Sequence, residues 1–497
     1  MLSALDKITL AWIACPFLLG FAIYLLPRFA RWLAVAISII SLIYAIALFW
    51  ANPTLNIQLL DNFGVSLLVD SLSAWFILTN ALVTTAVIFY CWQTGKTAFF
   101  YMQLVILHGS VNATFICADF MSQYVALEVI SIAAFSLISY PRADRTIWVG
   151  LRYLFISNTV MLFYLIGAVL VYKANNSFHY QGLLNAPPEA IALIFLGLLA
   201  KGGVFVSGLW LPLTHSESET PVSAMLSGIV VKSGIFPLLR CALLLEEIEP
   251  MVRMFGVATA LLGVSYAIFA QGTKRTLAFS TISQLGFILA APVAGGFYAF
   301  THGLAKSSLF LIAGNLPSRN FSELRTKGVG LKMWLALIFA SLSISGAPLL
   351  AGFGAKVLTG KELFSWQVSL INIATVGTAI TFAKFIFLPR QKSEPTLSGE
   401  GKVKQIQSGF WFALAILLGS LLVANGVYEQ AYSLKNLVKP LVTISVGWLA
   451  YLLIVRRVTI KLPRVMEQFE HLTGSMSLVL ILVFWMVQIQ LNFARYF

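Results

Sequence analysis

The stretch AIALIFLGLLAKGGVFVSGLWLPL, residues 190–213, places one lysine, Lys201, in the middle of an otherwise apolar run. About 20 apolar residues in a helix are long enough to cross the hydrocarbon core of a bilayer. A lysine at that depth costs roughly 2.5 to 3.5 kcal/mol on insertion scales, so it needs a partner, water or a function. Gly202 and Gly203 follow it and weaken the helix at the same depth. The segment therefore predicts a membrane helix that is broken beside a buried charge.

Apolar runs of this kind recur from one end of the chain to the other. Of its 497 residues 59% are hydrophobic and 10% charged, against roughly 25% charged in soluble domains. Backbone groups in lipid must be satisfied internally, which favours helices, and runs such as 162–171 and 478–487 lack the alternation of barrel strands. We expect an all-α, polytopic transmembrane helix bundle of about 16 spans. The expected spans are 9–27, 29–50, 69–92, 98–118, 120–140, 146–172, 190–213, 221–246, 251–270, 275–294, 297–316, 330–358, 366–388, 408–428, 438–455 and 474–492.

The distribution of positive charge gives an independent check on this count. The net charge is +14, and short cytoplasmic loops of membrane proteins carry the excess of Lys and Arg. Loops after odd-numbered spans hold roughly nineteen such residues and loops after even-numbered spans roughly five. Both termini are therefore expected on the non-cytoplasmic side. The exception is the acidic loop HSESE, residues 215–219, which follows an odd-numbered span.

Several classes of protein are excluded by what the sequence lacks. There is no basic, aromatic-interleaved domain outside the membrane for nucleic acid, and no GxGxxG in a βαβ context for a nicotinamide or flavin. The longest polar segments, 390–407 and 456–471, are loop-sized. We expect no cofactor, no metal and no enzymatic activity in this chain alone, and we interpret the apolar stretch after Lys7 as the first span rather than a removed signal. The cysteines lie far apart without a CxxC or Cys/His cluster: Cys15, Cys91, Cys117 and Cys241.

The candidate functional residues are ionisable side chains in the middle of expected spans. Burial disfavours the charged form of a lysine and a nearby carboxylate favours it, so a lysine with a variable partner acts as a proton switch. Taken alone, each such residue also fits snorkelling or helix pairing. The set, placed beside Gly and Pro breaks, favours proton translocation. The candidates are Glu128 in the fifth span, Lys201 in the seventh, Lys232 in the eighth, His302 and Lys306 one turn apart in the eleventh, and Lys356 in the twelfth.

Three further residues are secondary candidates. His108 is a lone histidine that fits a packing role, and Asp119 opens the fifth span, where a carboxylate suits the positive end of a helix. Lys384 lies near enough to a span end for snorkelling. The remaining charges near span ends are expected to be interfacial anchors: Asp70, Arg152 and Arg240.

At these residues the chain resembles the antiporter-like membrane subunits shared by respiratory complex I, its photosynthetic relative and the multisubunit Mrp cation/proton antiporters. The matching motifs occupy residues 119–356 in the family's order and spacing. They are Asp119-Phe120 with Glu128; Lys201 with WLP at 210–212 and TPVSA at 220–224 before Lys232; KRTLAFSTISQLG at 274–286; HGLAK at 302–306; and Pro348 with GFGAK at 352–356.

The resemblance implies a fourteen-helix core with two inverted five-helix repeats, each containing a broken helix. It implies that Glu128 is the partner of Lys201 and that Lys232 is the central relay. It also implies that Lys306 and His302 are connecting sites and that Lys356 is the terminal proton site. It divides the chain into N-terminal helices at 1–97, a first repeat at 98–246, a second at 251–389 and C-terminal helices at 390–497.

The chain also departs from the family pattern. Where many members have Pro-Phe-His before the tryptophan, this chain has Val206-Ser207-Gly208, and Ser218-Glu219 replaces the usual Ala-Pro before Thr220. The last broken helix ends in lysine, as in the D-type Mrp subunit and the N-type complex I subunit, whereas the M-type subunit has glutamate. Two extra apolar spans follow the core.

The resemblance implies a proton-conducting subunit of a multisubunit cation (sodium)/proton antiporter, in a prokaryotic plasma membrane or a thylakoid membrane. Its expected partners are sibling membrane subunits, protons, sodium and lipid, and not nucleic acid. Two alternatives stay open: a proton-pumping D-type subunit of an NAD(P)H or ferredoxin:plastoquinone oxidoreductase complex, and a mainly structural membrane subunit.

Overall fold

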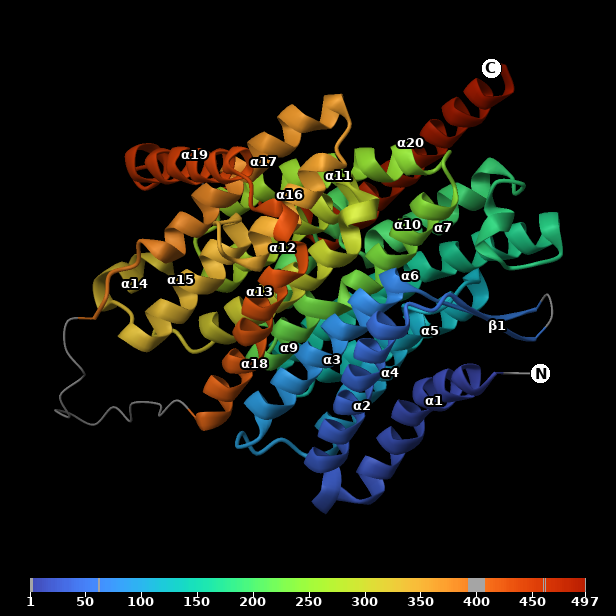
Figure 1. Ribbon diagram of the computed structural model, residues 1–497, viewed down its shortest axis with the longest axis horizontal. Helices are drawn as coiled ribbons and strands as arrows, with labels where there is room; N and C mark the ends of the chain where they lie inside the picture. Colours follow the sequence, from blue (N-terminus) through green and yellow to red (C-terminus); the bar gives the residue numbers. More distant parts are fainter. Residues whose placement is uncertain (1–2, 61–62, 392–406, 459, 461, 497) are drawn as a thin grey trace.

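The computed structural model describes residues 3–60, 63–391, 407–458, 460 and 462–496, and among these the side chains of all but residues 435 and 490–496. The chain folds into an elongated helical bundle with α1 and α2 toward one end and α14 and α15 toward the other (Figure 1). In the described residues, 11 helices are long and apolar enough to cross a membrane. The expected all-α, multi-pass architecture is confirmed.

The N-terminal region contains a small β-hairpin that the sequence analysis did not predict. The two strands of residues 55–69 pair with each other, with Leu55 opposite Val69. Strand β2 also exchanges backbone hydrogen bonds with the segment before the fifth span, since Leu68 N donates to Ile116 O at 2.7 Å. The elements are α1 (Ala4–Leu25), α2 (Ala30–Ala51), β1 (Leu55–Leu60), β2 (Gly64–Val69) and α3 (Ser71–Cys91).

The next group of helices contains the first break. The seventh expected span is divided after Lys201 into two helical parts that are bent by 41°. The eighth contains a π-helical segment, a local widening of the helix that leaves carbonyl groups without their usual partners. The elements are α4 (Ala98–Thr114), α5 (Phe120–Ile138), α6 (Asp144–Asn175), η2 (Tyr180–Leu183), α7 (Pro188–Lys201), η3 (Phe205–Gly208), α8 (Leu211–Glu217), α9 (Thr220–Met225), π-helical η4 (Leu226–Val230) and α10 (Lys232–Leu244).

The following group contains the second break, between α15 and α16, where Gly346 takes a left-handed backbone conformation and Pro348 follows. Helices α12 and α13 are inclined by 114° to each other. The elements are α11 (Glu249–Phe269), α12 (Thr273–Ala290), η5 (Pro292–Ala294), α13 (Gly295–Ala313), α14 (Phe321–Lys327), α15 (Leu331–Ser345), α16 (Ala351–Lys361) and α17 (Ser365–Ile386).

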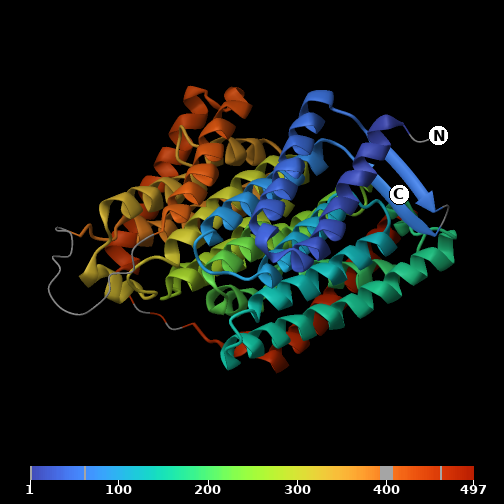
Figure 2. The ribbon, with the colours of Figure 1, turned by 90° about the horizontal axis from the view of Figure 1, so that it is seen from below.

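The C-terminal helices do not stay together. Helix α18 packs on α3 and α13, and α19 packs on α17, whereas α20 packs on α7 and η3. Figure 2 shows this last, red helix beside the group that runs from α4 to α10. Glu467, just before α20, forms an ion pair with Arg275, and burial raises the pKa of the Glu467 carboxyl. The elements are α18 (Ser408–Ala424), η6 (Asn425–Ala431), α19 (Leu434–Ala450), π-helical η7 (Tyr451–Val455), η8 (Val465–Glu467) and α20 (Phe469–Tyr496).

Each of the sixteen expected spans corresponds to a helix or a broken helix. Eleven of them are single helices that are long and apolar enough to cross a membrane. The others are α4, which is shorter, the broken helices α7–α8 and α15–α16, and the pair α12 and α13. The division into N-terminal helices, two inverted repeats and C-terminal helices stays a prediction.

Candidate functional site

Lys201 lies at the first helix break, where the sequence placed it. It is the last residue of α7, and Gly203, two residues on, has a φ of +69° that ends the helix. The Lys201 amine, buried inside the bundle, donates hydrogen bonds to the hydroxyls of Ser131 on α5 and Ser157 on α6. Trp210 Nε1 donates to the backbone oxygen of Ala200 at 2.8 Å, which satisfies a carbonyl that the break frees. A cavity of about 10 Å³ adjoins the lysine, close to the volume that one water needs.

Glu128 lies near Lys201 without forming a direct ion pair. Its carboxylate and the Lys201 amine interact electrostatically, but among the described residues no ion pair within 4.0 Å joins them. Glu128 Oε1 is buried and has no hydrogen-bond partner within the described chain. The expected partnership is therefore one between charges at a distance, and the two serines are the groups that Lys201 contacts.

Lys232 lies where the eighth span is widened, directly after the π-helical segment η4. Its amine is completely buried and donates to the carbonyl oxygen of Gly228 at 2.5 Å and, less closely, to that of Ser227 at 3.4 Å. The widened turn leaves these carbonyls free to accept. Nearby, Gly234 packs against the backbone of Gly202, and a Cβ there would be 2.2 Å from Gly202 N. The absence of side chains at both glycines brings the Lys201 break and the Lys232 helix together.

His302 and Lys306 lie on α13, which faces Lys232. A Cβ added at Gly303 would be 3.4 Å from the Lys232 amine, so this amine lies against the turn that carries His302. Lys306 donates to the carbonyl oxygen of Leu277 at 3.1 Å, and its amine is 5.2 Å from the centre of the Phe382 ring. Both ring nitrogens of His302 are buried, and no described residue forms a hydrogen bond with either. An unsatisfied buried imidazole is costly, which favours a site that takes up a proton or a water.

Lys356 lies on α16, directly after the second helix break. It donates to the carbonyl oxygen of Ser345, the last residue of α15, at 3.1 Å. Gly346, with φ of +83°, leaves room for this contact, because a Cβ there would be 2.7 Å from Lys356 Cδ. A cavity of about 10 Å³ is lined by both His302 and Lys356. On its other side Lys356 borders a cavity of about 340 Å³.

The secondary candidates have structural contacts. His108 is fully buried with its ring nitrogens 2.8 Å from Ser41 Oγ and 3.1 Å from Thr84 Oγ1, as a packing histidine would be. Asp119 caps α5 by accepting from Ser122 N at 2.7 Å. Lys384 does not extend to the surface as expected: its buried amine donates to the carbonyl oxygen of Ala267 at 3.1 Å, near the end of α11.

Of the expected interfacial anchors, Arg240 is buried, whereas Asp70 and Arg152 are partly exposed. Arg240 is 4% exposed and forms an ion pair with Asp70, which also caps α3. Arg152 donates to the backbone oxygen of Glu467. These arginines hold elements together, since chain segments far apart in sequence supply their partners.

Two buried groups were not identified as site residues from the sequence. His215 is fully buried, the backbone of Leu211 and of Leu226 lies near its ring, and it interacts electrostatically with Lys274 and Lys306. Its ring centre is 5.9 Å from that of Phe310, one turn after Lys306. Lys274 is 2% exposed. The acidic neighbours of His215 predict a polar loop, whereas its position three residues after Pro212, in a matching motif, is the signal that points to the site.

The arrangement as a whole is a series of basic side chains, buried at all positions except the partly exposed Lys356, that begins at one helix break and ends at the other. Lys201, Lys232, Lys306 and Lys356 each donate to a hydroxyl or a backbone carbonyl, and His302 lies near the last three. In the part of the chain that the structure describes, no group of three or more His, Cys, Asp or Glu side chains fits a metal ion. Such a series is suited to passing protons between neighbouring amines and water.

A known family matches the part of the chain that holds this series. The family described as NADH:quinone oxidoreductase/Mrp antiporter, TM matches residues 117–381, which is more than half of the chain. Every primary candidate residue lies within the matched range.

Curated relatives include two kinds of protein. The N subunit of NADH-quinone oxidoreductase from Desulforudis audaxviator is 28% identical over 65% of this chain and 72% of its own length. NAD(P)H-quinone oxidoreductase chain 4 2 of Microcystis aeruginosa is 25% identical over 76% of this chain and 78% of its own length. The D subunit of the Na(+)/H(+) antiporter from Alkalihalophilus pseudofirmus is 26% identical over 59% of this chain and 66% of its own length.

Solved structures share the fold. A chain of the archaeal membrane-bound sulfane sulfur reductase superposes with a TM-score of 0.74 at 21% identity, covering 90% of this chain and 99% of that chain. A chain of the Mrp complex from Dietzia sp. superposes with a TM-score of 0.71 at 18% identity, covering 95% and 100%.

Proposed function

Since the chain belongs to the NADH:quinone oxidoreductase/Mrp antiporter transmembrane family, we propose that it is a proton-conducting membrane subunit of a multisubunit cation/proton antiporter. Protons move along Lys201, Lys232, His302 with Lys306, and Lys356, and Glu128 modulates Lys201. Sibling membrane subunits supply the rest of the assembly and the path of the exchanged cation, for which we propose sodium. The chain itself carries out no redox chemistry.

The observation that carries this proposal is that Lys232 lies close to the helix that carries His302 and Lys306, and that His302 in turn lies close to Lys356. The amine of Lys232 lies against Gly303, and a cavity of about one water's volume adjoins both His302 and Lys356. A purely structural histidine needs a fixed partner with satisfied geometry, whereas the described residues give His302 none at either ring nitrogen. A group that alternates between protonated and neutral forms fits these surroundings.

Replacing Lys232 tests the proposal most directly. Lys232→Ala should reduce proton-coupled transport by roughly 100-fold or more, because Lys232 is the amine that donates to the widened turn of η4. Transport is measured in vesicles that contain the assembled complex, at matched expression. Lys332→Ala, the same change at an exposed lysine at the start of α15, is the control and should transport normally. Near-normal transport by Lys232→Ala would return Lys232 to a structural role.

The alternative assembly is a redox-driven complex in which other chains transfer electrons. It is favoured by the oxidoreductase relatives, one of which matches 76% of this chain, against 59% for the antiporter relative. The lysine at the end of the last broken helix does not separate the two assemblies, because the D-type Mrp subunit and the N-type complex I subunit both have it. Purification in mild detergent decides between them: co-purified iron–sulfur or flavin subunits would establish the redox-driven assembly and overturn the antiporter.

We propose that both termini lie on the non-cytoplasmic side of a prokaryotic plasma membrane or a thylakoid membrane. The even number of spans and the loop charges support this orientation. A reporter that is active only in the cytoplasm, fused after Phe497, should stay silent. Strong activity would mean that the orientation is reversed or the number of spans odd.

A further inference from the structure

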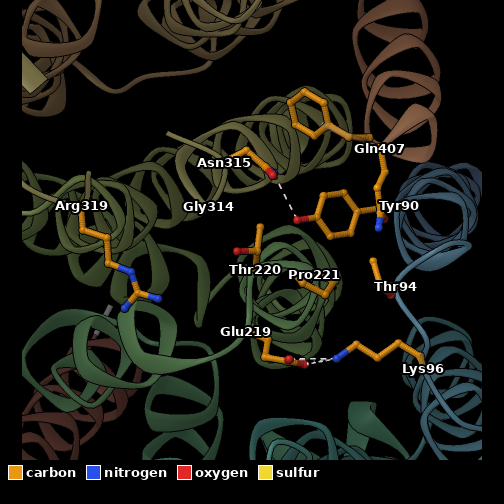
Figure 3. A pocket seen from close by; sticks show the side chains of 11 residues that line it. Tyr90, Thr94, Lys96, Glu219, Thr220, Pro221, Gly314, Asn315, Arg319 and Gln407 are labelled. Atoms are coloured by element: carbon orange, nitrogen blue, oxygen red, sulfur yellow. Dashed lines mark hydrogen bonds and ion pairs between the residues drawn. The ribbon is translucent and has the colours of Figure 1, made fainter. Parts of the chain in front are cut away.

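A cavity of about 460 Å³ lies at the end of the bundle where α3, α9, α13 and α18 meet. This end carries the positively charged loops and is the face that we propose to be cytoplasmic. Figure 3 shows Lys96 and Arg319 on opposite sides of the cavity and Glu219 with Thr220 between them. The polar lining residues are Tyr90, Thr94, Lys96, Glu219, Thr220, Asn315, Arg319 and Gln407.

Glu219 supplies the carboxylate of this cavity, and it occupies a position where the resembling subunits usually have Ala-Pro. It forms an ion pair with Lys96 at 2.6 Å, in which the Lys96 side chain is 11% exposed and that of Glu219 32%. The Lys96 amine is also 4.6 Å from the centre of the Tyr140 ring. Lys96 is therefore held firmly, while the carboxylate stays open to the cavity.

A buried amine lies directly behind this ion pair. Lys274 donates to the backbone oxygen of Ser218 at 2.9 Å and to Ser223 Oγ at 3.2 Å. Ser223 Oγ in turn donates to the backbone oxygen of Glu219 at 3.0 Å, and Lys274 interacts electrostatically with the Glu219 carboxylate. Further inward, the His215 ring interacts with both Lys274 and Lys306. Ionisable groups thus continue from the cavity to the buried series.

We propose that Glu219 is the proton-accepting group of an intake that leads from this cavity to Lys306. This inference rests on the proposed function and adds the entrance to it. A hydronium ion in the cavity gives its proton to the carboxylate, which leaves water and releases the ion pair with Lys96. The acid then passes the proton to a neutral amine at Lys274, and the carboxylate pairs with Lys96 again.

The charged and titratable surroundings of Glu219 come from several elements. The acidic neighbour Glu217 lies 3.7 Å from Arg145 Nε and also interacts electrostatically with Lys274, less strongly than Glu219 does. The groups that face or interact with Glu219 are Lys96 from the α3–α4 loop, Tyr90 and Cys91 from α3, Lys274 from α12 and Arg319 beyond α13.

The test compares variants of the full complex in vesicles over a pH series. Glu219→Gln should lower the initial rate of proton uptake roughly tenfold, with the largest loss at high pH, because an amide cannot collect scarce protons. Glu219→Asp, which retains a carboxylate, should keep most of the rate. Glu323→Gln, the same change at an exposed carboxylate of α14 that pairs with Lys327, should behave as wild type. Equal rates and pH profiles for Glu219→Gln and wild type would overturn the inference.

A second variant covers the case in which the first one does not assemble. Glu219→Gln leaves the largely buried amine of Lys96 without its partner, which itself destabilises the fold. The double change Lys96→Gln with Glu219→Gln removes both charges and should assemble, yet it should transport as slowly as Glu219→Gln. Wild-type transport by the double variant would show that the ion pair is only structural.

Failure of the inference and failure of the proposed function give different results. If the wild-type complex moves no protons, the proposed function fails. A second outcome is that wild type transports protons, Lys232→Ala does not, and Glu219→Gln transports them like wild type at every pH. In that case only the proposed intake is overturned.

Discussion

The two helix breaks both place a lysine beside freed backbone, but they surround it differently. At the first break Lys201 is enclosed by hydroxyls from α5 and α6, with the Glu128 carboxylate in electrostatic range and a cavity of about 10 Å³. At the second break Lys356 donates to a carbonyl of the broken helix itself and borders a cavity of about 340 Å³.

This contrast indicates different roles for the same residue type. A closed site with a nearby carboxylate stabilises a charge that stays in the protein, whereas a site open to a larger cavity suits exchange with water. The described residues that line the larger cavity include Lys361 and Lys439 and no carboxylate. We therefore expect the second break to be more sensitive to loss of its lysine than the first.

The largest effect is expected at Lys356. Lys356→Met should lower transport roughly 100-fold or more, because Lys356 and His302 are the two basic side chains among the described residues that line the inner cavity. Lys361→Met, at an exposed lysine on the larger cavity, is the matched control and should transport normally. Proton uptake by vesicles at matched expression measures both. Comparable losses in the two variants would mean that the cavity's charge, not Lys356, matters.

The next effect concerns coupling at the first break. Glu128→Gln and Lys201→Ala should each reduce transport, and the double variant should lose less than the sum, by about 0.5 to 1 kcal/mol. The modest coupling follows from an electrostatic interaction without a direct ion pair between these described side chains. Transport by wild type, both single variants and the double variant completes the cycle. Strict additivity would separate the two residues.

A smaller effect is expected from the glycine at the second break. Gly346→Ala should destabilise the fold by about 1 to 2 kcal/mol because its φ is +83°, and it should slow transport, since the new methyl group would press on Lys356 Cδ. Gly360→Ala on α16, whose added Cβ would meet no described atom within 4 Å, serves as the control. Thermal unfolding in detergent and vesicle transport report the two effects. A melting temperature of Gly346→Ala equal to that of wild type would contradict the expected backbone strain.

The smallest effect on transport is expected at Lys384. Lys384→Met should cost about 1 to 3 kcal/mol of stability, because it leaves carbonyl groups near the end of α11 without their donor. Transport per assembled complex should stay within about twofold of wild type, because Lys384 has a structural role. A much larger loss is expected for a lysine that relays protons. Melting temperature and transport are measured on the same preparation. A large loss of transport at unchanged stability would add Lys384 to the relay.

Much of the site could be predicted because the cost of burying charge is visible in the sequence. Glu128, Lys201, Lys232, Lys306 and Lys356 stand out as ionisable residues in apolar runs. His215 does not stand out in this way, because it does not lie in an apolar run. Its neighbours are polar, and only the packing of α8 on α12 and α6, with the ring of His215 near Phe310 of α13, shows that the ring is buried.

The misjudged residues share one feature, which is that their partners are distant in sequence. Arg240 was expected at the interface, yet it pairs with Asp70, 170 residues away. Lys384 was expected to snorkel, yet it donates to the carbonyl of Ala267, 117 residues away. The hairpin at residues 55–69 depends on backbone pairing with residues 116–118. Such contacts leave no local pattern.

The sequence by itself determined the membrane-spanning helices, the two breaks and the buried lysines, because hydrophobicity, helix-breaking residues and the energy of burying a charge are local properties. The tertiary structure decided which groups each lysine contacts. Lys201 contacts serine hydroxyls rather than Glu128, and Lys232 donates to a carbonyl of a widened turn. The ion pair between Lys96 and Glu219 lies at a cavity. Those contacts depend on distances between helices, which the packing of the whole chain sets.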